Sequence, residues 1–162
     1  MNEIMPFENT LLIIDDMSDN LNLLSKLLTL AGFNTLTAQS GPEGIQIAKT
    51  EHPDLILLDL MMPGMDGFQV CEYLKSQKNT QDIPVIFMTA LADTTNKVKG
   101  FQLGAADYIT RPFQHQEVLA RIQTHLKICK LQQKLIQKNQ HLQQEIVERK
   151  QAQEALNQSH ER

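Results

Sequence analysis

The stretch that decides the fold is Asp54–Gly67, which reads D-L-I-L-L-D-L-M-M-P-G-M-D-G. Its apolar run, Leu55–Leu58, is too short for a helix and suits a central parallel strand that is covered on both faces. The run ends at Asp59, and Pro63-Gly64 then breaks the chain into a loop. A buried carboxylate is costly unless it is needed, and ligands of open α/β sheets bind at this edge. Asp59 is therefore a candidate functional residue; a carboxylate that merely caps a turn is the alternative.

Short segments that read as strands, two of them apolar runs like this one, recur along the chain and alternate with helical patterns. The other segments are Thr10–Ile14, Asn34–Ala38, Val85–Met88 and Asp107–Thr110. Between them, apolar residues recur at helical spacing and Gly or Pro marks the helix ends. We expect Ser18 to cap the first of these helices. The alternation predicts an α/β fold, a doubly wound five-stranded parallel sheet with helices on both faces.

Composition narrows the classes of function. The 162 residues suffice for one domain of about 100–150 residues and an appendage. The formal net charge of -4 gives no indication of nucleic-acid or anionic-membrane binding. Cys71 and Cys129 stand far apart, which fits a reducing compartment better than a disulfide or a metal site. Met1–Glu8 lacks a signal-peptide pattern, and no apolar run reaches membrane-spanning length, so we expect a cytoplasmic protein without a membrane partner.

The last predicted helix continues far beyond the length that a sheet can cover. Gln114–His160 contains no Pro or Gly and consists mostly of good helix formers. Its first part, Val118–Leu126, has an apolar face wide enough to pack on the sheet. Beyond it, the apolar positions narrow to a seam with a period of seven, which is typical of a coiled coil. The residues of this predicted seam are Ile128, Leu135, Asn139, Leu142, Ile146 and Leu156. A single solvated helix is the alternative, because Arg149 and Gln153 also fall on the seam.

Acidic and hydroxyl side chains stand where several predicted strands end. Asp15 and Asp16 follow the first strand, Asp59 ends the third and Thr89 follows the fourth. Because parallel strands share one carboxyl edge, we expect these groups to converge. Clustered carboxylates repel one another, and a hard cation such as Mg²⁺ compensates them. An aspartate placed there can attack phosphorus, while Thr89 and Arg111 can hold phosphoryl oxygens.

These residues stand in motifs of a known family. Residues Thr10–Leu126 resemble the receiver domain of two-component response regulators, through the motifs L-I-I-D-D, L-L-D-L-M-M-P-G-M-D-G, V-I-F-M-T-A and G-A-A-D-Y-I-T-R-P-F. The resemblance implies a flavodoxin-like sheet with strand order 2-1-3-4-5. We accordingly expect a leader at 1–9, a receiver domain at 10–127 and a coiled-coil linker helix at 128–162.

The resemblance also implies a role for each site residue. Asp59 would be the phosphoacceptor, and Mg²⁺ (or Mn²⁺) would be held by Asp15, Asp16, Asp59 and the backbone carbonyl of Met61. The implied phosphate-binding and switch residues are Thr89, Ala90, Tyr108, Arg111 and Pro112. Thr89 would be drawn toward the phosphate, and Tyr108 would then move inward.

One position departs from the family pattern. Receivers usually carry lysine where this chain has Arg111, and the following bond to Pro112 is usually cis. Arginine keeps the charge, but its planar fork approaches a phosphate differently. This departure puts the phosphorylation rate and the coupling to the switch in question.

The sequence therefore predicts a signalling receiver and not a turnover enzyme. Asp59 would accept a phosphoryl group from a sensor histidine kinase or a phosphotransfer protein. The tail Leu142–Arg162 looks like the helices that join receivers to output modules, so we expect a piece of a longer protein that forms a homodimer through this helix. No DNA-reading motif accompanies it, and we expect no nucleic-acid partner.

Two alternatives stay open at this stage. The first is a phosphorylation-independent scaffold with a receiver fold that dimerises through the long helix. The second is a phosphatase with an aspartate nucleophile. Such enzymes typically carry a second acid two residues after the nucleophile, where this chain has Met61.

Overall fold

A computed structural model of the protein describes residues 9–90 and 94–160. Nearly all of the predicted leader, 1–9, lies outside the described residues. Within them the strands are β1 (Thr10–Ile14), β2 (Asn34–Ala38), β3 (Leu55–Asp59), β4 (Val85–Ala90) and β5 (Asp107–Arg111). The helices are α1 (Ser18–Leu30), α2 (Gly41–Glu51), α3 (Gly67–Ser76), α4 (Thr94–Gln102) and α5 (His115–His160).

The strands form one parallel sheet in the order β2-β1-β3-β4-β5, which confirms the predicted doubly wound topology. The register pairs Ile14 with Leu58, and Leu58 with Phe87. It also pairs Thr89 with Thr110. The carboxyl ends of β1, β3, β4 and β5 are therefore level, and the residues that follow them share one edge of the sheet.

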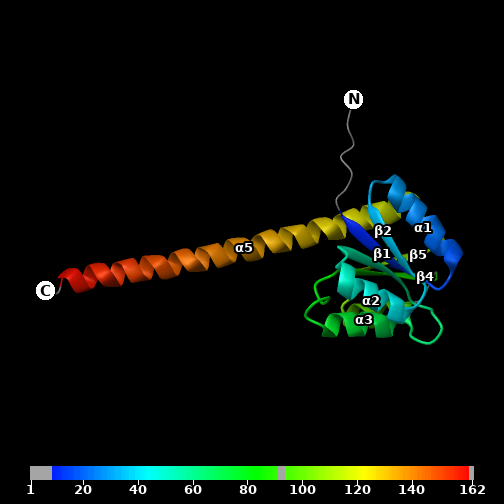
Figure 1. Cartoon of the computed structure of the whole chain (residues 1–162), viewed down its shortest axis with the longest axis horizontal. Coiled ribbons are helices and arrows are strands. Elements are labelled where there is room, and N and C mark those ends of the chain that lie inside the picture. Colours follow the sequence, from blue (N-terminus) through cyan, green and yellow to red (C-terminus); the bar gives the residue numbers. More distant parts are fainter. Residues whose placement is uncertain (1–8, 91–93, 161–162) are drawn as a thin grey trace, which may run out of the picture. The chain divides into compact units, whose positions relative to one another are not determined.

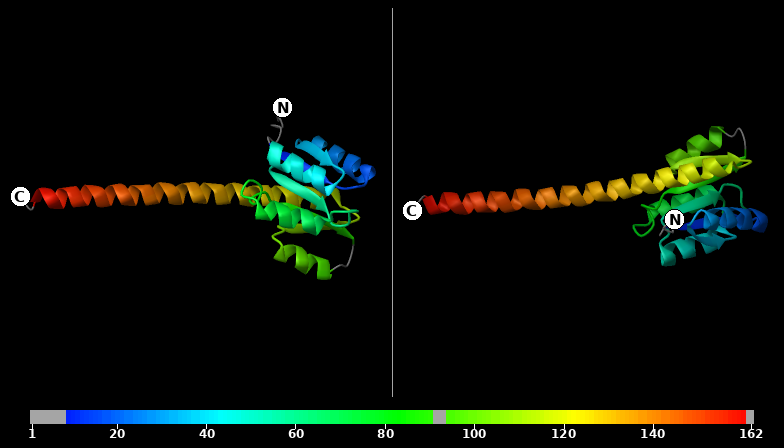
Figure 2. Two further views of the ribbon diagram at one scale, coloured as in Figure 1. Left: turned by 60° about the horizontal axis from the view of Figure 1, so that its bottom comes forward. Right: turned by 90° about the horizontal axis from the view of Figure 1, so that it is seen from above.

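Both faces of the sheet are covered by helices, because successive strand residues point to opposite sides. Leu12 and Ile14 of β1 belong to one apolar cluster, which also contains residues of α2 and α3. Leu11 and Ile13 belong to the other cluster, together with residues of α1 and the first turns of α5. Figure 1 shows α2 and α3 on one side of the strands, and Figure 2 shows α4 continuing that layer beside α3. The buried strand Leu55–Leu58 thus forms the centre of a three-layer domain.

Local signals explain how two of these helices begin. Asp66 caps α3 through a capping box: its carboxylate accepts from the Gln69 N–H at 2.9 Å, and the Gln69 side chain accepts from the Asp66 N–H at 3.0 Å. The expectation that Ser18 caps α1 is wrong, because Ser18 is the first helical residue and Met17 is the N-cap without a side-chain hydrogen bond. Instead, Asp15 Oδ1 accepts from the Met17 N–H at 3.0 Å, so the acid that follows β1 orders the start of α1.

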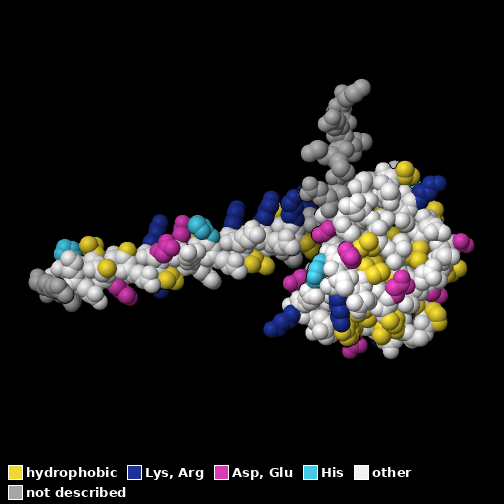
Figure 3. Space-filling model, in the orientation of Figure 1, with side chains coloured by type: hydrophobic (Ala, Val, Ile, Leu, Met, Phe, Trp, Pro, Cys, Tyr) yellow, Lys and Arg dark blue, Asp and Glu magenta, His cyan; other side chains and the backbone are white. Residues whose placement is uncertain are grey.

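The chain divides into two compact units, Met1–Leu126 and Lys127–Arg162. In the first unit, α5 buries Val118 and Ile122 against the sheet. In the second unit, α5 is helical as far as His160, and Figure 3 shows hydrophobic side chains standing out from it. Each predicted apolar seam residue, from Ile128 to Leu156, is 41–59% exposed. The domain boundary at 127/128 and the coiled coil stay predictions.

None of the helices in residues 9–90 and 94–160 is long and apolar enough to cross a bilayer.

Candidate functional site

Three carboxylates meet at the carboxyl edge of the sheet. Asp15 and Asp16 follow β1, and Asp59 is the last residue of β3. One oxygen of each lies within 4.8 Å of the others. Asp15 and Asp59 are buried, at 0% and 4% exposure, whereas Asp16 is exposed. The cluster therefore has a buried floor and an open side, and its oxygen donors suit a hard divalent cation.

Arg111, at the end of β5, lies against this cluster. Its Nη2 is 2.7 Å from Asp15 Oδ2 and 3.4 Å from Asp59 Oδ1. The guanidinium also lies over the ring of Phe113, 5.7 Å from its centroid. Its Nε is buried without a hydrogen-bond partner among the described residues. A buried donor without an acceptor is unfavourable, so the Nε–H of Arg111 is available to donate a hydrogen bond to an oxygen of a ligand.

The environment of Asp59 favours its protonated form. Burial is the largest cause and the negative charge of Asp15 adds to it, and together they raise the pKa of Asp59 to about 7. The charge of Arg111 and the backbone hydrogen bond from Met61 oppose this rise. The latter bond joins the Met61 N–H to Asp59 Oδ1 at 3.3 Å. An additional cation beside Asp59 would shift the balance toward the carboxylate.

The hydroxyl expected at the site is in place at the end of β4. Thr89 is 4% exposed, and its hydroxyl donates to the carbonyl of Ala90 at 2.8 Å. Ala90 is exposed and pairs in register with Arg111 on β5. The Arg111–Pro112 peptide bond is cis, as predicted. Thr89, Ala90 and Arg111 thus stand next to one another at the edge that carries Asp59.

Tyr108, the predicted switch residue, lies in a buried position. It is 5% exposed, and its hydroxyl lies 2.9 Å and 2.7 Å from the carbonyl oxygens of Asn96 and Lys97 in α4. Its ring makes an edge contact with Phe101, with centroids 4.9 Å apart, and a tilted contact with Phe87 at 5.6 Å. Tyr108 therefore connects the sheet beside the site to α4.

Sequence reasoning did not single out two residues that complete the site. The Asn20 side chain donates to Asp15 Oδ2 at 3.2 Å from the first turn of α1. Phe113 supports the guanidinium of Arg111. Asn20 stands five residues after Asp15, within reach across one helical turn, but the spacing by itself does not distinguish it from a solvated helix residue. Phe113 was visible in the R-P-F motif, whose family resemblance drew attention to Arg111 and Pro112.

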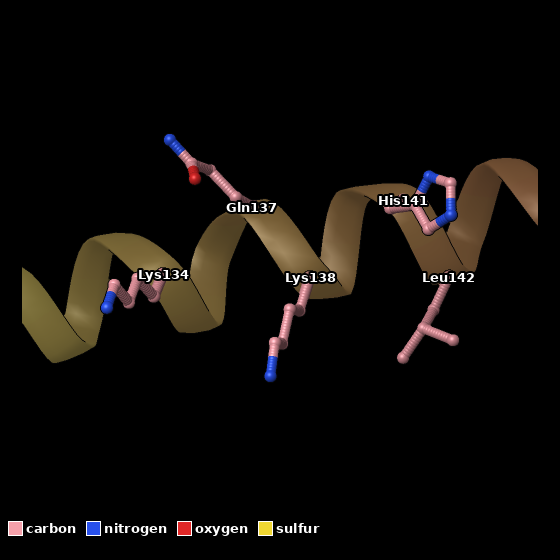
Figure 4. Close-up of a pocket in the computed structure, with 5 residues that line it drawn as sticks. All are labelled: Lys134, Gln137, Lys138, His141 and Leu142. Carbon is pink, nitrogen blue, oxygen red and sulfur yellow. The ribbon is translucent and has the colours of Figure 1, made fainter.

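A hollow on the second unit does not form a comparable site. Lys134, Gln137, Lys138, His141 and Leu142 line it. Figure 4 shows that all five side chains project from the single helix α5 and do not converge on a common point. A ligand site normally encloses its ligand and directs polar groups at it. This hollow has one wall, so we assign no ligand to it.

The fold and the site together define an open α/β sheet with an acid cluster at its carboxyl edge. The chain matches the family model of the response regulator receiver domain over residues 11–123. It therefore belongs to the receiver family of response regulators.

The relatives within the family differ in length. The chain is 44% identical over 117 residues to the DNA-binding dual master transcriptional regulator RpaA of Synechocystis, which covers 72% of this chain and 48% of that protein. It is 40% identical over 114 residues to the response regulator PleD of Caulobacter vibrioides, covering 70% and 25%. The receiver domain of the Francisella response regulator 1452 superposes with a TM-score of 0.69 at 31% identity, covering 74% of this chain and 98% of that one. The chain thus spans about half the length of RpaA and a quarter of PleD.

Proposed function

We propose that this receiver takes a phosphoryl group on Asp59 from a phosphohistidine of a sensor kinase or a phosphotransfer protein. One observation carries the proposal: the oxygens of Asp15, Asp16 and Asp59 lie within 4.8 Å of one another at the edge that Thr89 and Arg111 share. A buried acid cluster is unfavourable for folding by itself, which indicates that it is kept for binding or chemistry.

The chemical step is a transfer between two nucleophiles. An oxygen of the Asp59 carboxylate attacks phosphorus, the O–P bond forms and the P–N bond to the histidine breaks. The electron pair of the broken bond stays on the ring nitrogen, and because the other ring nitrogen of the phosphohistidine carries a proton, the leaving group is a neutral imidazole. The product is an aspartyl phosphate that water hydrolyses slowly, so the domain acts as a signal carrier rather than as an enzyme with turnover.

The residues at the cluster fit Mg²⁺, or Mn²⁺ in its place. Asp15, Asp16, Asp59 and the backbone carbonyl of Met61 would hold it; carboxylate and carbonyl oxygens are the ligands that such cations prefer. When bound, the cation would neutralise charge on the phosphoryl group in transit. Asn20 and the Met17 N–H hold the carboxylate of Asp15 in position through hydrogen bonds of 3.2 Å and 3.0 Å.

Arg111, beside the cis Pro112, is proposed to contact the phosphoryl group. Its guanidinium already lies 3.4 Å from Asp59, and its buried Nε has no acceptor among the described residues. Thr89 would turn its hydroxyl from the Ala90 carbonyl toward a phosphoryl oxygen, and the backbone N–H of Ala90 would assist. An Arg111→Ala variant that accepts phosphate and switches like the wild type would contradict this role.

The output is proposed to run through Tyr108 and α5. Movement of Thr89 would shift the equilibrium between two positions of Tyr108, which would change the face formed by β4, β5 and their helices α4 and α5. The α5 helix would carry this change to an output module or partner, as a parallel coiled coil of two copies that pair along the seam from Ile128 to Leu156, with Asn139 setting the register. We also keep the cytoplasm as the expected location, because Cys71 and Cys129 stand far apart in the sequence without a C-x-x-C pattern, which fits a reducing compartment.

A phosphorylation-independent scaffold is the second candidate. The observation that favours it is the ion pair of Arg111 with Asp15. The guanidinium neutralises the charge of a carboxylate that would otherwise bind the metal. The phosphatase alternative has less support, because Met61 stands where a second acid would be required and its side chain is 76% exposed.

The test compares light scattering after size exclusion, with Mg²⁺, for free protein and protein treated with beryllium fluoride. This reagent mimics a phosphoryl group on Asp59. The control is Asp59→Asn treated in the same way. Conversion of monomer to dimer only when Asp59 is present supports the proposal. A dimer in all three samples indicates a constitutive coiled coil, and direct transfer from a phosphorylated kinase domain then separates rearrangement from scaffolding.

A further inference from the structure

Gly100 is a buried glycine in the last turn of α4 (Thr94–Gln102), where a helical residue other than glycine would be the more stable choice. Its φ lies outside the left-handed region, so the backbone does not require glycine there. In a helix interior, glycine is less favourable than alanine by about 1 kcal/mol. Another requirement must therefore exclude a side chain at this position.

The requirement is the phenol of Tyr108. A Cβ on Gly100 would lie 1.7 Å from the Tyr108 hydroxyl oxygen, 2.8 Å from its Cζ and 3.0 Å from Cδ2 of Phe87. Real Cβ atoms do not approach other atoms so closely. Any side chain at position 100 would therefore displace the Tyr108 ring from its present position.

The remaining contacts of the phenol come from the same turn of α4. The Tyr108 hydroxyl reaches the carbonyls of Asn96 and Lys97, which precede Gly100 by four and three residues. Phe101 packs against the edge of the ring from the following position. We name Asn96, Lys97, Gly100 and Phe101 the Tyr108 socket.

We propose that Gly100 is the positioning residue for Tyr108. Because Gly100 has no side chain, the Tyr108 socket has room for the phenol, and Tyr108 can occupy its buried position. The consequence for signalling rests on the proposed function. If Tyr108 moves between two positions when Asp59 is phosphorylated, the residue at position 100 sets the balance between them.

The first experiment measures the environment of Tyr108 directly. The chain has two tyrosines, so a Tyr73→Phe background leaves Tyr108 as the only phenol. Burial raises the pKa of Tyr108 to about 12. Adding Gly100→Ala is expected to lower this pKa toward the ordinary value of about 10, read from tyrosinate absorbance. A Gly100→Ala protein whose Tyr108 still titrates near 12 would overturn the proposal.

A second measurement avoids alkaline pH and tests the cause. Gly100→Ala is expected to lower the melting temperature when Tyr108 is present. In a Tyr108→Ala background, the same change is expected to raise it, because alanine is the better helix former. An increase in both backgrounds would show that Tyr108 does not need the glycine. The environment of Tyr108 can also be followed by fluorine NMR of 3-fluorotyrosine at position 108. The matched control is Gln102→Ala, an exposed position in the same helix, which should leave this signal unchanged.

Failure of the proposed function is distinguishable from failure of the socket. Beryllium fluoride should shift the 3-fluorotyrosine signal of the wild-type chain if Tyr108 responds to Asp59. A signal that responds to Gly100→Ala and not to beryllium fluoride supports the socket and contradicts the switch. A signal that responds to beryllium fluoride and not to Gly100→Ala contradicts the socket alone.

Discussion

Asp59 is buried at the end of β3, beside the negative charge of Asp15, and its ionisation should therefore weaken the folded state. Its folded pKa, about 7, lies above the value of about 3.9 in an unfolded chain. The native state consequently binds more protons between these values, and stability falls as pH rises from about 4 to 7. In metal-free buffer at pH 8, Asp59→Asn should raise the free energy of unfolding by about 2–4 kcal/mol.

Denaturant unfolding at pH 4, 6 and 8 checks this prediction. The gain from Asp59→Asn should shrink toward pH 4, where the wild-type carboxyl is protonated in the folded state and about half protonated in the unfolded state. The exposed Asp16 is the matched control, and Asp16→Asn should show a much smaller gain at pH 8. Equal gains from both variants would contradict the burial argument.

Arg111 is expected to oppose metal binding before phosphorylation. Its Nη2 pairs with Asp15 Oδ2 at 2.7 Å, and Asp15 is one of the proposed Mg²⁺ ligands. Removal of this tethered cation should raise Mg²⁺ affinity about threefold to tenfold in Arg111→Ala, where tenfold corresponds to about 1.4 kcal/mol. Isothermal titration calorimetry measures the Mg²⁺ affinity. Arg121→Ala, which removes a cation away from the site, is the control. Unchanged or weaker binding would show that Arg111 does not compete.

At the scale of elements, the start of β5 is tied to α5 by a polar network around Asp107. Asp107 Oδ1 accepts from Arg121 Nη1 at 2.7 Å and from the Tyr108 N–H at 2.8 Å, and Oδ2 lies 2.9 Å from His125 Nε2. Burial alone would raise the pKa of Asp107. The hydrogen bonds from His125, the Tyr108 backbone and Arg121 outweigh it and hold the pKa below its ordinary value. The carboxylate form is thus the one that stabilises this junction.

Asp107→Asn should accordingly destabilise the domain by about 1.5–3 kcal/mol at pH 7, the range for hydrogen bonds to charged groups. A lowered folded pKa means that the contribution is present above the unfolded pKa of about 3.9 and is lost as pH falls through the folded value. The difference from wild type should therefore shrink below about pH 4. Thermal unfolding across this range tests it. The exposed Asp82→Asn should change little, and a pH-independent difference would contradict the electrostatic account.

At the scale of the whole molecule, the second unit exposes apolar side chains along one helix, which favours a second copy as its partner. Leu142 is 53% exposed and Ile146 is 53% exposed. Because a charge at a coiled-coil core position is strongly unfavourable, Leu142→Glu should convert a dimer to a monomer. Gln144→Glu adds the same charge on another face of the helix and should leave the mass unchanged. Light scattering at equal protein concentration measures the molecular mass of each variant. Identical masses for both variants would contradict the prediction that Leu142 lies at a dimer interface.

The sequence by itself determined the elements and their order. Unbroken apolar runs such as Leu55–Leu58 have few alternatives to a buried parallel strand, and glycine and proline mark where the chain turns. The motifs around Asp15, Asp59 and Thr89 predicted which groups would meet, because parallel strands bring their carboxyl ends to one edge. Ser18 is not the cap because the helix begins one residue earlier than expected, with Ser18 as its first residue and Met17 at the N-cap.

Only the tertiary structure decided what surrounds each of these groups. Pairing of Arg111 with Asp15 spans 96 residues, so it depends on the register of the four strands β1, β3, β4 and β5. The same holds for Gly100, whose sequence context suggests only a helix weakened by a glycine. Its physical reason is visible once Tyr108 of β5 lies against α4 with no room for a Cβ. Local pattern thus specifies elements and edges, whereas distances, burial and the fit between side chains arise from packing between segments that are remote in the chain.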